Sequence, residues 1–389
     1  MRQSRSITKP SLKLTTALML ACLLMAAVAT QPLQAQTLRL LHSFKGPEGE
    51  FPLASMIRDS AGNLYGTTNN GGTSGNGTVF KLSKGHILTV LHNFAGSPND
   101  GANPQAALLR DAAGNLYGTT VDGGAAGGGT VYEIDASGTE TVLYSFIGQG
   151  DGIYPLGNLV RDKMGNLYST TSALVPDNTG TVFKLDKTGK LTTLYTFSAG
   201  AGGNTPTGNL VRDGSGNLYG TCEFGGENAY GTVYKLDMTG NLTVLHSFDE
   251  TDGAPYGGLI ADAEGNLYGS TSGAVFQITE ATGVFTLLHT FVPRTEGTES
   301  YATVARDAAG NLYGANNQLG GGCHDGGCGT IWKLDTSNLL TVLTNFGEGN
   351  RGKFPRGGVV LDKAGNLYGT TSEGGGGCRY CGTVFEITP

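Results

Sequence analysis

Residues 111–120 read DAAGNLYGTT, and the tetrapeptide Gly-Asn-Leu-Tyr inside this stretch occurs seven times along the chain. The copies lie about 50 residues apart, a period typical of propeller repeats, and they begin at Gly62, Gly114, Gly165, Gly216, Gly265, Gly310 and Gly365. A unit of this length is one supersecondary element that is too small to bury its own apolar surface, so it must pack against copies of itself. The sequence therefore predicts an array of seven similar units.

Each unit contains four short strand patterns. In the second unit they are residues 106–110 (AALLR), 115–120 (NLYGTT), 130–134 (TVYEI) and 140–146 (ETVLYSF), all rich in β-branched, leucine and aromatic residues. The motif Asp-x-x-Gly-Asn joins the first two as a tight hairpin, because its Asp accepts backbone N–H groups and its Gly supplies a positive φ. Leu116 and Tyr117 are adjacent and should point to opposite faces, so both are buried only if the sheet is covered on both sides. This favours propeller blades over an open sandwich.

The two ends of the chain complement each other. Residues 38–44 (LRLLHSF) match a fourth strand with no first three before it, and the last unit stops after a third-strand pattern at residues 384–387. We therefore expect an all-β fold: a seven-bladed propeller of four-stranded blades over residues 36–389, closed by the N-terminal strand in the last blade.

The first 35 residues have the pattern of an export signal. Arg2, Arg5, Lys9 and Lys13 precede the apolar residues 14–29, which are too few to span a membrane comfortably, and Ala35 is the favoured cleavage position. We expect residues 1–35 to be a signal peptide, with an uncleaved anchor as the alternative, and the mature chain to be extracellular, periplasmic or on the cell surface, without a membrane span. Cleavage removes four basic residues and no acidic residue from a chain of net charge −7, which leaves −11. An acidic chain without a basic run is a poor nucleic-acid binder.

The string GNLYGTT…GG…GTVFKL, followed by LTVLHSF, resembles the GloVer tandem repeat of bacterial exported proteins, often described as choice-of-anchor proteins. The resemblance covers essentially the whole mature chain. It implies a β-propeller-like, secreted or surface-displayed repeat protein, and it brings no established catalytic residues.

Several repeated polar residues are interpreted as structural. His42, His92, His246 and His289 share one position of the fourth strand, where other units carry Tyr or Thr, and a catalytic histidine would be expected once. The hairpin aspartate of every unit is assigned to folding, and the arginine that often precedes it to a surface or turn contact. Because no nucleophile–base set, P-loop or zinc-protease motif is present, we predict no catalytic residue, no metal and no cofactor.

Four cysteines occupy the same inter-strand loop in the last two units, as Cys323-x4-Cys328 and Cys378-x2-Cys381. In an exported protein this pattern predicts two local disulfides, Cys323–Cys328 and Cys378–Cys381. A four-thiolate zinc site between the two units is the alternative, because the spacings also suit zinc. Cys222 is expected to be a buried, inert thiol.

Two groups of residues are candidates for a binding site on the channel rim. Asp100, Asp151 and Asp252 each precede a glycine in the loop that enters a blade, although ordinary turn chemistry also explains them. One position breaks the repetition, six residues before each hairpin aspartate: Leu53, Gln105, Leu156, Thr207, Tyr256, Tyr301 and Arg356. Tyr256, Tyr301 and Arg356 are consecutive in the ring and suit stacking on a sugar or binding an anion.

These features predict a secreted or surface-associated module that binds a glycan, a cell-wall component or an extracellular protein without catalysis, and that is a monomer. Two alternatives remain open at this point. One is a polysaccharide lyase or hydrolase that uses the three loop aspartates, and the other is a structural or adhesive surface protein.

Overall fold

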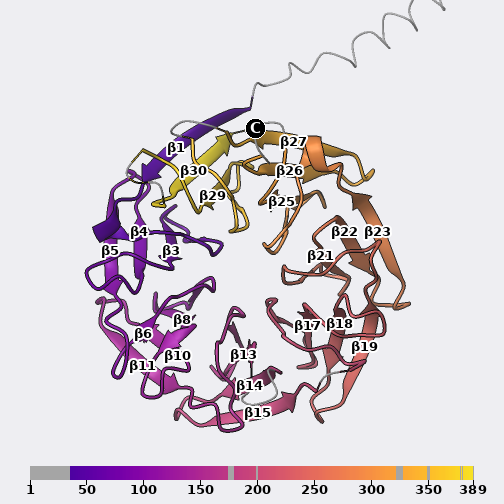
Figure 1. Ribbon diagram of the computed structural model, residues 1–389, viewed down its shortest axis with the longest axis horizontal. Coiled ribbons are helices and arrows are strands. Elements are labelled where there is room, and N and C mark those ends of the chain that lie inside the picture. Colours follow the sequence, from indigo (N-terminus) through magenta and orange to yellow (C-terminus); the bar gives the residue numbers. More distant parts are fainter. Residues whose placement is uncertain are drawn as a thin grey trace, which may run out of the picture. The chain divides into compact units, whose positions relative to one another are not determined.

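Seven four-stranded antiparallel sheets form a ring, which is the all-β, seven-bladed propeller that the sequence predicts (Figure 1). The computed structural model describes residues 36–173, 179–198, 200–320, 327–347, 351–376, 378 and 380–388. Within these ranges the helical segments are the 3-10 turn η1 (Gly46–Glu48) and the single-turn helix α2 (Pro293–Glu296). Residues 1–35, for which we predict a signal peptide, lie outside the described residues.

Within each blade the strands run outward from the ring axis. The innermost strands have two residues each: β2 (Ile57–Arg58), β7 (Leu109–Arg110), β12 (Val160–Arg161), β16 (Val211–Arg212), β20 (Ile260–Ala261), β24 (Ala305–Arg306) and β28 (Val360–Leu361). The second strands are β3 (Leu64–Thr68), β8 (Leu116–Thr120), β13 (Leu167–Thr171), β17 (Leu218–Cys222), β21 (Leu267–Ser270), β25 (Leu312–Asn316) and β29 (Leu367–Thr371). The third strands are β4 (Thr78–Leu82), β10 (Thr130–Ile134), β14 (Thr181–Leu185), β18 (Thr232–Leu236), β22 (Ala274–Ile278), β26 (Thr330–Leu334) and β30 (Thr383–Thr388). The outermost strands are β5 (Leu88–Asn93), β11 (Glu140–Ser145), β15 (Leu191–Thr196), β19 (Leu242–Ser247), β23 (Phe285–Thr290), β27 (Leu340–Asn345) and β1 (Thr37–Ser43). A two-residue pair, β6 (Gly101–Ala102) with β9 (Asp122–Gly123), links two loops.

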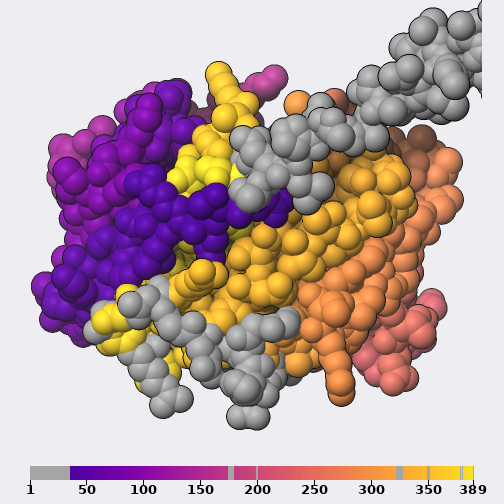
Figure 2. Space-filling model, turned by 90° about the horizontal axis from the view of Figure 1, so that it is seen from above, coloured from indigo at the N-terminus to yellow at the C-terminus, as the bar shows by residue number. Residues whose placement is uncertain are grey.

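The N-terminal strand closes the ring, as predicted. In the last blade the strand order is β1-β30-β29-β28, and β1 pairs with β30 from Thr37↔Thr388 to Ser43↔Thr383. Figure 2 shows the indigo N-terminal residues lying against the yellow C-terminal ones. This pairing hides the outer edge of β30, which would otherwise be open to another strand.

The apolar core is divided among the interfaces between adjacent blades. Leu116 and Tyr117 are both buried, as expected for a sheet covered on both faces. At every interface the aromatic residue after an outermost strand contacts a ring of the next blade's third strand, with centroids 5.0–5.5 Å apart and planes inclined by 52–69°. The seven pairs are Phe44–Phe80, Phe94–Tyr132, Phe146–Phe183, Phe197–Tyr234, Phe248–Phe276, Phe291–Trp332 and Phe346–Phe385. Such pairs add about 0.5–1.5 kcal/mol each beyond area burial, so they help to fix the stacking of the blades.

The hairpin aspartates have the folding role expected of them. Asp162 accepts hydrogen bonds from the backbone N–H groups of Met164 (2.9 Å) and Asn166 (2.9 Å), from the Asn166 amide (2.7 Å) and from the Tyr168 hydroxyl (3.0 Å). Gly165 completes the turn with φ 89°. Burial alone would raise the pKa of Asp162, but the hydrogen bonds from Asn166 and Tyr168 outweigh burial and hold this pKa below its usual range.

The arginines before these aspartates, expected to make a surface or turn contact, connect adjacent blades. The Arg161 guanidinium lies 5.1 Å from the centroid of the Tyr117 ring in the preceding blade and donates a 3.1 Å hydrogen bond to Asp111. The same stacking, at 5.4–5.7 Å, joins Arg58 to Tyr368, Arg110 to Tyr65, Arg212 to Tyr168 and Arg306 to Tyr268. A partly exposed cation–π contact of this kind contributes about 0.5–1 kcal/mol.

The innermost strands are shorter than expected. The pattern 106–110 predicts five strand residues, but only Leu109 and Arg110 pair with β8. The residues before them satisfy their backbone groups through neighbouring blades instead: the Thr67 hydroxyl donates to the Ala106 carbonyl (3.4 Å), and the Ala107 N–H donates to the Asn158 side chain (2.6 Å). The segment that leaves the ladder lines the ring axis.

Candidate ligand site in the central channel

The segments that precede the innermost strands surround one cavity on the ring axis. Its volume is about 170 Å³. The seven side chains that vary at one repeat position all line it: Leu53, Gln105, Leu156, Thr207, Tyr256, Tyr301 and Arg356. The structure thus brings Tyr256, Tyr301 and Arg356 together at a single cavity.

The position after each of these residues is restricted to Ala or Gly because neighbouring blades approach closely there. A Cβ atom on Gly357 would lie 2.5 Å from the carbonyl oxygen of Ala54 in the first blade. Real Cβ contacts of that length do not occur, so this position cannot carry a larger side chain. The variable side chains are therefore held against a backbone wall that has little freedom to move.

A belt of polar side chains connects the blades just beyond this wall. Asn158 accepts from the Ala107 N–H (2.6 Å), and Asn209 accepts from the Asn158 N–H (3.0 Å). The Asn209 amide also donates to the Thr303 hydroxyl (2.5 Å), and these three polar side chains line the cavity. Sequence reasoning missed them, although they stand two positions after the variable residue in their units. Comparing that second position across the repeats would have shown that polar groups gather there as well.

Tyr256, Tyr301 and Arg356 form a continuous stack. The two phenol rings lie 4.8 Å apart between centroids with planes inclined by 25°, and the Arg356 guanidinium lies 4.8 Å from the centroid of Tyr301. Tyr301 contacts both of its neighbours and lies between them in the order of the blades. Its hydroxyl donates a 2.9 Å hydrogen bond to Glu299.

The two phenols are held in their neutral form. Burial, with the hydrogen bond to Glu299 adding to it, raises the pKa of Tyr301 to about 12. Burial also raises the pKa of Tyr256, with further contributions from the negative charges of Glu223 and Glu299. Both hydroxyls are therefore protonated at neutral pH and are able to donate hydrogen bonds.

Asp100, Asp151 and Asp252 do not line this cavity. All three are buried, and each is bonded to the outermost strand before it: Asp100 to His92 (3.0 Å), Asp151 to Tyr144 (3.0 Å) and Asp252 to His246 (2.9 Å). The sequence pattern predicted these aspartates on the channel rim, but the structure does not bring them together there.

The same contact recurs at other blades and gives the fourth-strand histidines a structural role, as predicted. His42 bonds to Glu48 (3.1 Å) and His289 to Glu296 (2.8 Å). Glu296 also accepts the backbone N–H of Val292 (2.8 Å). Each carboxylate thus ties the end of an outermost strand to the loop that leads into the next blade.

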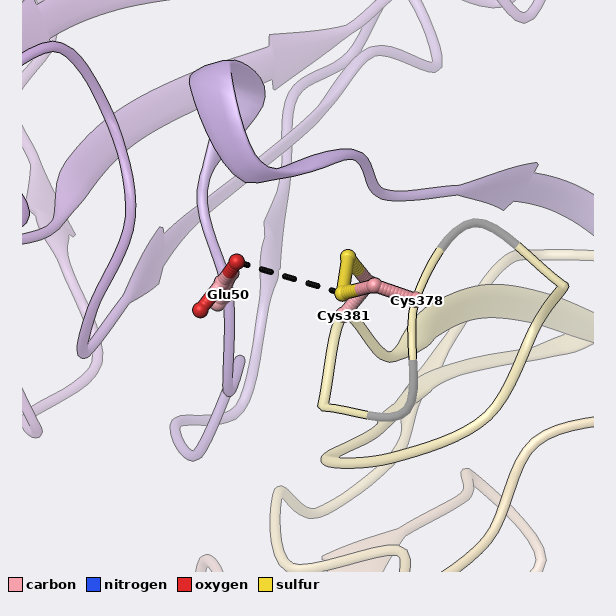
Figure 3. Close-up of side chains that lie close together, drawn as sticks. All are labelled: Glu50, Cys378 and Cys381. Atoms are coloured by element: carbon pink, nitrogen blue, oxygen red, sulfur yellow. Dashed lines mark hydrogen bonds between the residues drawn. A yellow bond between two sulfur atoms is a disulfide. The ribbon is translucent and has the colours of Figure 1, made fainter.

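The described loop cysteines are bonded to sulfur. Cys378 and Cys381 form the predicted disulfide (Figure 3). Cys328 is disulfide-bonded, and Cys323, its predicted partner, lies outside the described residues. Sulfur in a disulfide is not a thiolate, so these described cysteines do not supply the four-thiolate zinc site considered as the alternative. Cys222 is buried, and burial raises the pKa of its thiol, consistent with an inert side chain.

The disulfide loop of the last blade packs against the first blade. Oε1 of Glu50 lies 3.9 Å from Sγ of Cys378 (Figure 3), which is a contact without a hydrogen bond because a disulfide sulfur has no proton to donate. The rings of Phe51 and Tyr380 stack with centroids 5.3 Å apart, and the Phe51 N–H donates to the Tyr380 carbonyl (3.2 Å). The seam, which is the interface between the last and the first blade, is therefore joined by these loop contacts as well as by β1.

Comparison with known families identifies a repeat family. The model of the Gloeobacter/Verrucomicrobia repeat matches residues 27–213, 98–273 and 270–389. Together these ranges include all seven copies of the tetrapeptide. Among curated proteins no sequence matches.

Solved structures of other propellers are similar in fold. Virginiamycin B lyase from Staphylococcus aureus has a TM-score of 0.62 at 11% identity, over 91% of this chain and 99% of that one. Oligogalacturonate lyase from Vibrio parahaemolyticus has a TM-score of 0.58 at 11% identity, over 92% and 94% of the two chains. The extracellular domain of a hybrid two component system from B. thetaiotaomicron has a TM-score of 0.56 at 14% identity, over 90% of this chain and 41% of that one. At these identities the similarity shows the fold alone. In the described part of the chain no helix has the length and apolarity to cross a membrane.

Proposed function

We propose a binding role for this chain, which belongs to the Gloeobacter/Verrucomicrobia repeat family. In this proposal it is an exported, non-catalytic module that holds the end of an acidic glycan in its central cavity. One observation carries the proposal: the seven side chains that vary among otherwise similar blades converge on this cavity. A symmetric ring becomes a specific site only through such variation, and ligand sites combine aromatic walls with a few convergent polar groups.

The chemistry of the lining favours a sugar that carries a carboxylate. Arg356 supplies a cation in a fork geometry that suits a carboxylate. Gln105, Asn158 and Asn209 supply amides, which can both donate to and accept from sugar hydroxyls. The cavity is smaller than the roughly 300–1,000 Å³ of sites for drug-sized ligands, so it would take one terminal ring rather than a buried oligosaccharide.

The stack assigns different roles to the two tyrosines. Tyr301 contacts Tyr256 and Arg356, so it has little free ring face to offer. Tyr256 ends the stack and is the better platform for a sugar ring. In this proposal Tyr301 acts as a spacer that orients Tyr256 and Arg356.

The lining is poorly equipped for hydrolysis or elimination. Among the described residues that line the cavity there is no Asp, Glu, His, Cys or Lys. A pKa of about 12 leaves Tyr301 almost entirely protonated at neutral pH, so it is a poor general base. The candidate carboxylates Asp100, Asp151 and Asp252 are engaged in contacts between strands and loops.

Export is part of the proposal. It is supported by the basic and apolar pattern of residues 1–29, by the disulfide Cys378–Cys381 and by the similarity to an extracellular propeller domain. We propose a monomer, because β1 covers the outer edge of β30 and completes the last blade without a strand from another chain.

Titration of mature protein with an array of acidic and neutral glycans, followed by calorimetry on the best ligand, tests this function. Arg356→Gln should weaken binding of an acidic glycan about 10- to 100-fold, because a hydrogen bond to a charged group contributes about 1.5–3 kcal/mol. Arg294→Gln, on the exposed helix α2 outside the cavity, removes the same charge and should leave affinity unchanged. Tyr256→Ala should cost about tenfold, and Tyr301→Phe much less.

Two outcomes would count against the proposal. Equal affinity of Arg356→Gln and wild type would place the ligand elsewhere. New reducing ends or unsaturated products from an array ligand would favour the enzyme alternative.

A further inference from the structure

One position near the start of the outermost strand is apolar in six blades and glutamate in one. In every blade this residue pairs with an apolar residue of the third strand, for example Ile134↔Glu140 in the second blade and Leu82↔Leu88 in the first. The six apolar residues pack into the cluster shared with the preceding blade: Leu38, Leu88, Leu191, Leu242, Phe285 and Leu340. Glu140 therefore stands where the repeat uses an apolar contact.

Glu140 faces a histidine–carboxylate pair of the preceding blade. Nε2 of His92 lies 3.0 Å from Oδ2 of Asp100, and one donor atom from each of His92, Asp100 and Glu140 lies within 4.8 Å of the other two. The equivalent neighbours elsewhere in the ring confirm that this position reaches the histidine, because Phe285 stacks on His246 with centroids 3.5 Å apart. One imidazole and two carboxylates thus meet at a single blade interface.

The charges of this cluster are not balanced by the protein. Oε1 of Glu140 is buried and has no hydrogen-bond partner. Asp100 is 8% exposed, and it already accepts from the N–H groups of Ala95 (2.7 Å) and Gly101 (2.6 Å), so it is held as a carboxylate. A second, partly buried carboxylate beside it is costly unless a cation or a proton compensates it. Consistent with this, burial and then the charge of Asp100 raise the pKa of Glu140 to about 7.

We infer that His92, Asp100 and Glu140 form a divalent metal site between the first two blades, with zinc as the ion that suits the ligand set. Imidazole and carboxylate ligands are typical of zinc, and three protein ligands leave one position for water. A tetrahedral zinc with bonds of about 2.1 Å holds its ligand atoms roughly 3.4 Å apart, so small side-chain shifts complete the geometry. The ion would tie the start of β11 to the end of β5. This site lies outside the central cavity and does not depend on the proposed function.

The test uses untagged mature protein that has been treated with a chelator and dialysed. Zinc is added in calorimetry, and the bound metal is counted after gel filtration. The informative variant is Glu140→Leu, because leucine occupies this position in most other blades and should fold well. The other histidine–carboxylate pairs, such as His246–Asp252, remain intact in this variant and serve as an internal control. Glu264→Gln removes an exposed carboxylate elsewhere and controls for weak surface binding.

We expect one zinc ion per wild-type chain, with a melting temperature that rises until one equivalent has been added. Glu140→Leu should melt at least as high without metal, should bind at least tenfold more weakly, and should no longer respond to zinc. Glu264→Gln should behave as wild type. The inference is overturned if wild-type protein binds no zinc, or if Glu140→Leu binds it as wild type does.

Discussion

Removing the N-terminal strand should open the ring. Deleting residues 36–45 takes away β1 and leaves the last blade with three strands. Phe44, which is fully buried, accounts for about 3–5 kcal/mol by itself on the scale of core Phe→Ala substitutions. The half-buried Leu38 and Leu41 add about 1 kcal/mol each. The total is comparable with the roughly 5–15 kcal/mol that stabilises a typical domain.

Thermal unfolding followed by circular dichroism measures this loss. We expect residues 46–389 to melt at least about 10 °C below residues 36–389, because about 5 kcal/mol is lost at roughly 2 °C per kcal/mol for a domain of this size. Phe44→Ala and Phe146→Ala form a matched pair, since both rings are fully buried at the same repeat position. Only Phe44 follows a strand that the chain does not connect directly to its blade. Phe44→Ala should therefore speed amide exchange selectively in β1 and β30, and Phe146→Ala should not.

Coincident melting curves for the two lengths would refute closure by β1. Equal exchange patterns in the two phenylalanine variants would show that the seam is no weaker than the other blade interfaces. In that case the contacts of the disulfide loop with Glu50 and Phe51 would be the stronger part of the closure.

Three other interactions can be perturbed separately. Because the pKa of Asp162 is lowered in the folded protein, this carboxylate stabilises the fold at pH values above its unfolded-state pKa of about 3.9. That stabilisation is lost as the pH falls through the folded-state pKa. Asp162→Asn should therefore reduce the loss of stability in acid, measured by denaturant titration from pH 6 to pH 2. Replacing Cys378 and Cys381 with serine should lower the free energy of unfolding by about 2 kcal/mol on the chain-entropy model. A reductant should give wild type a larger loss, because it also cleaves the disulfide of Cys328. Gly129→Ala should cost about 2–3 kcal/mol because its Cβ would strike the backbone of the second strand, whereas Gly138→Ala has a similar φ with open space around it and should cost less.

The ring could be predicted from the sequence because each of its determinants is local or periodic. The Asp-x-x-Gly-Asn hairpin depends on residues four apart, and the burial of Leu116 and Tyr117 follows from strand geometry. The complementary ends at Leu38 and Ile387 required only a comparison of repeat fragments. These features can be inferred without knowing how one blade is rotated relative to the next.

Contacts between blades could not be predicted, because they depend on that rotation. Arg161 reaches Tyr117 about one repeat away, and nothing in its own unit indicates this partner. Asp100 follows an outermost strand as a turn residue would, yet it turns back to His92 and not toward the axis. The variable position that lines the channel could be found from the sequence, because variation among repeats is visible without a structure. The stacking of Tyr301 between Tyr256 and Arg356 could not be predicted in this way.

Departures from a repeat are most informative where they oppose folding. At the variable position that lines the channel, Tyr256 or Arg356 costs little stability, because a side chain at the axis has no fixed partner in the repeat. Variation at this position therefore reflects weak structural constraint as well as function. Glu140 is different, because a half-buried leucine at the same position in other blades contributes about 1 kcal/mol and a carboxylate gives up that contribution. It also places a second negative charge beside Asp100. The cost of this carboxylate calls for a compensating interaction that the blades with an apolar residue at this position do not need. A cation bound by His92, Asp100 and Glu140 would supply that interaction.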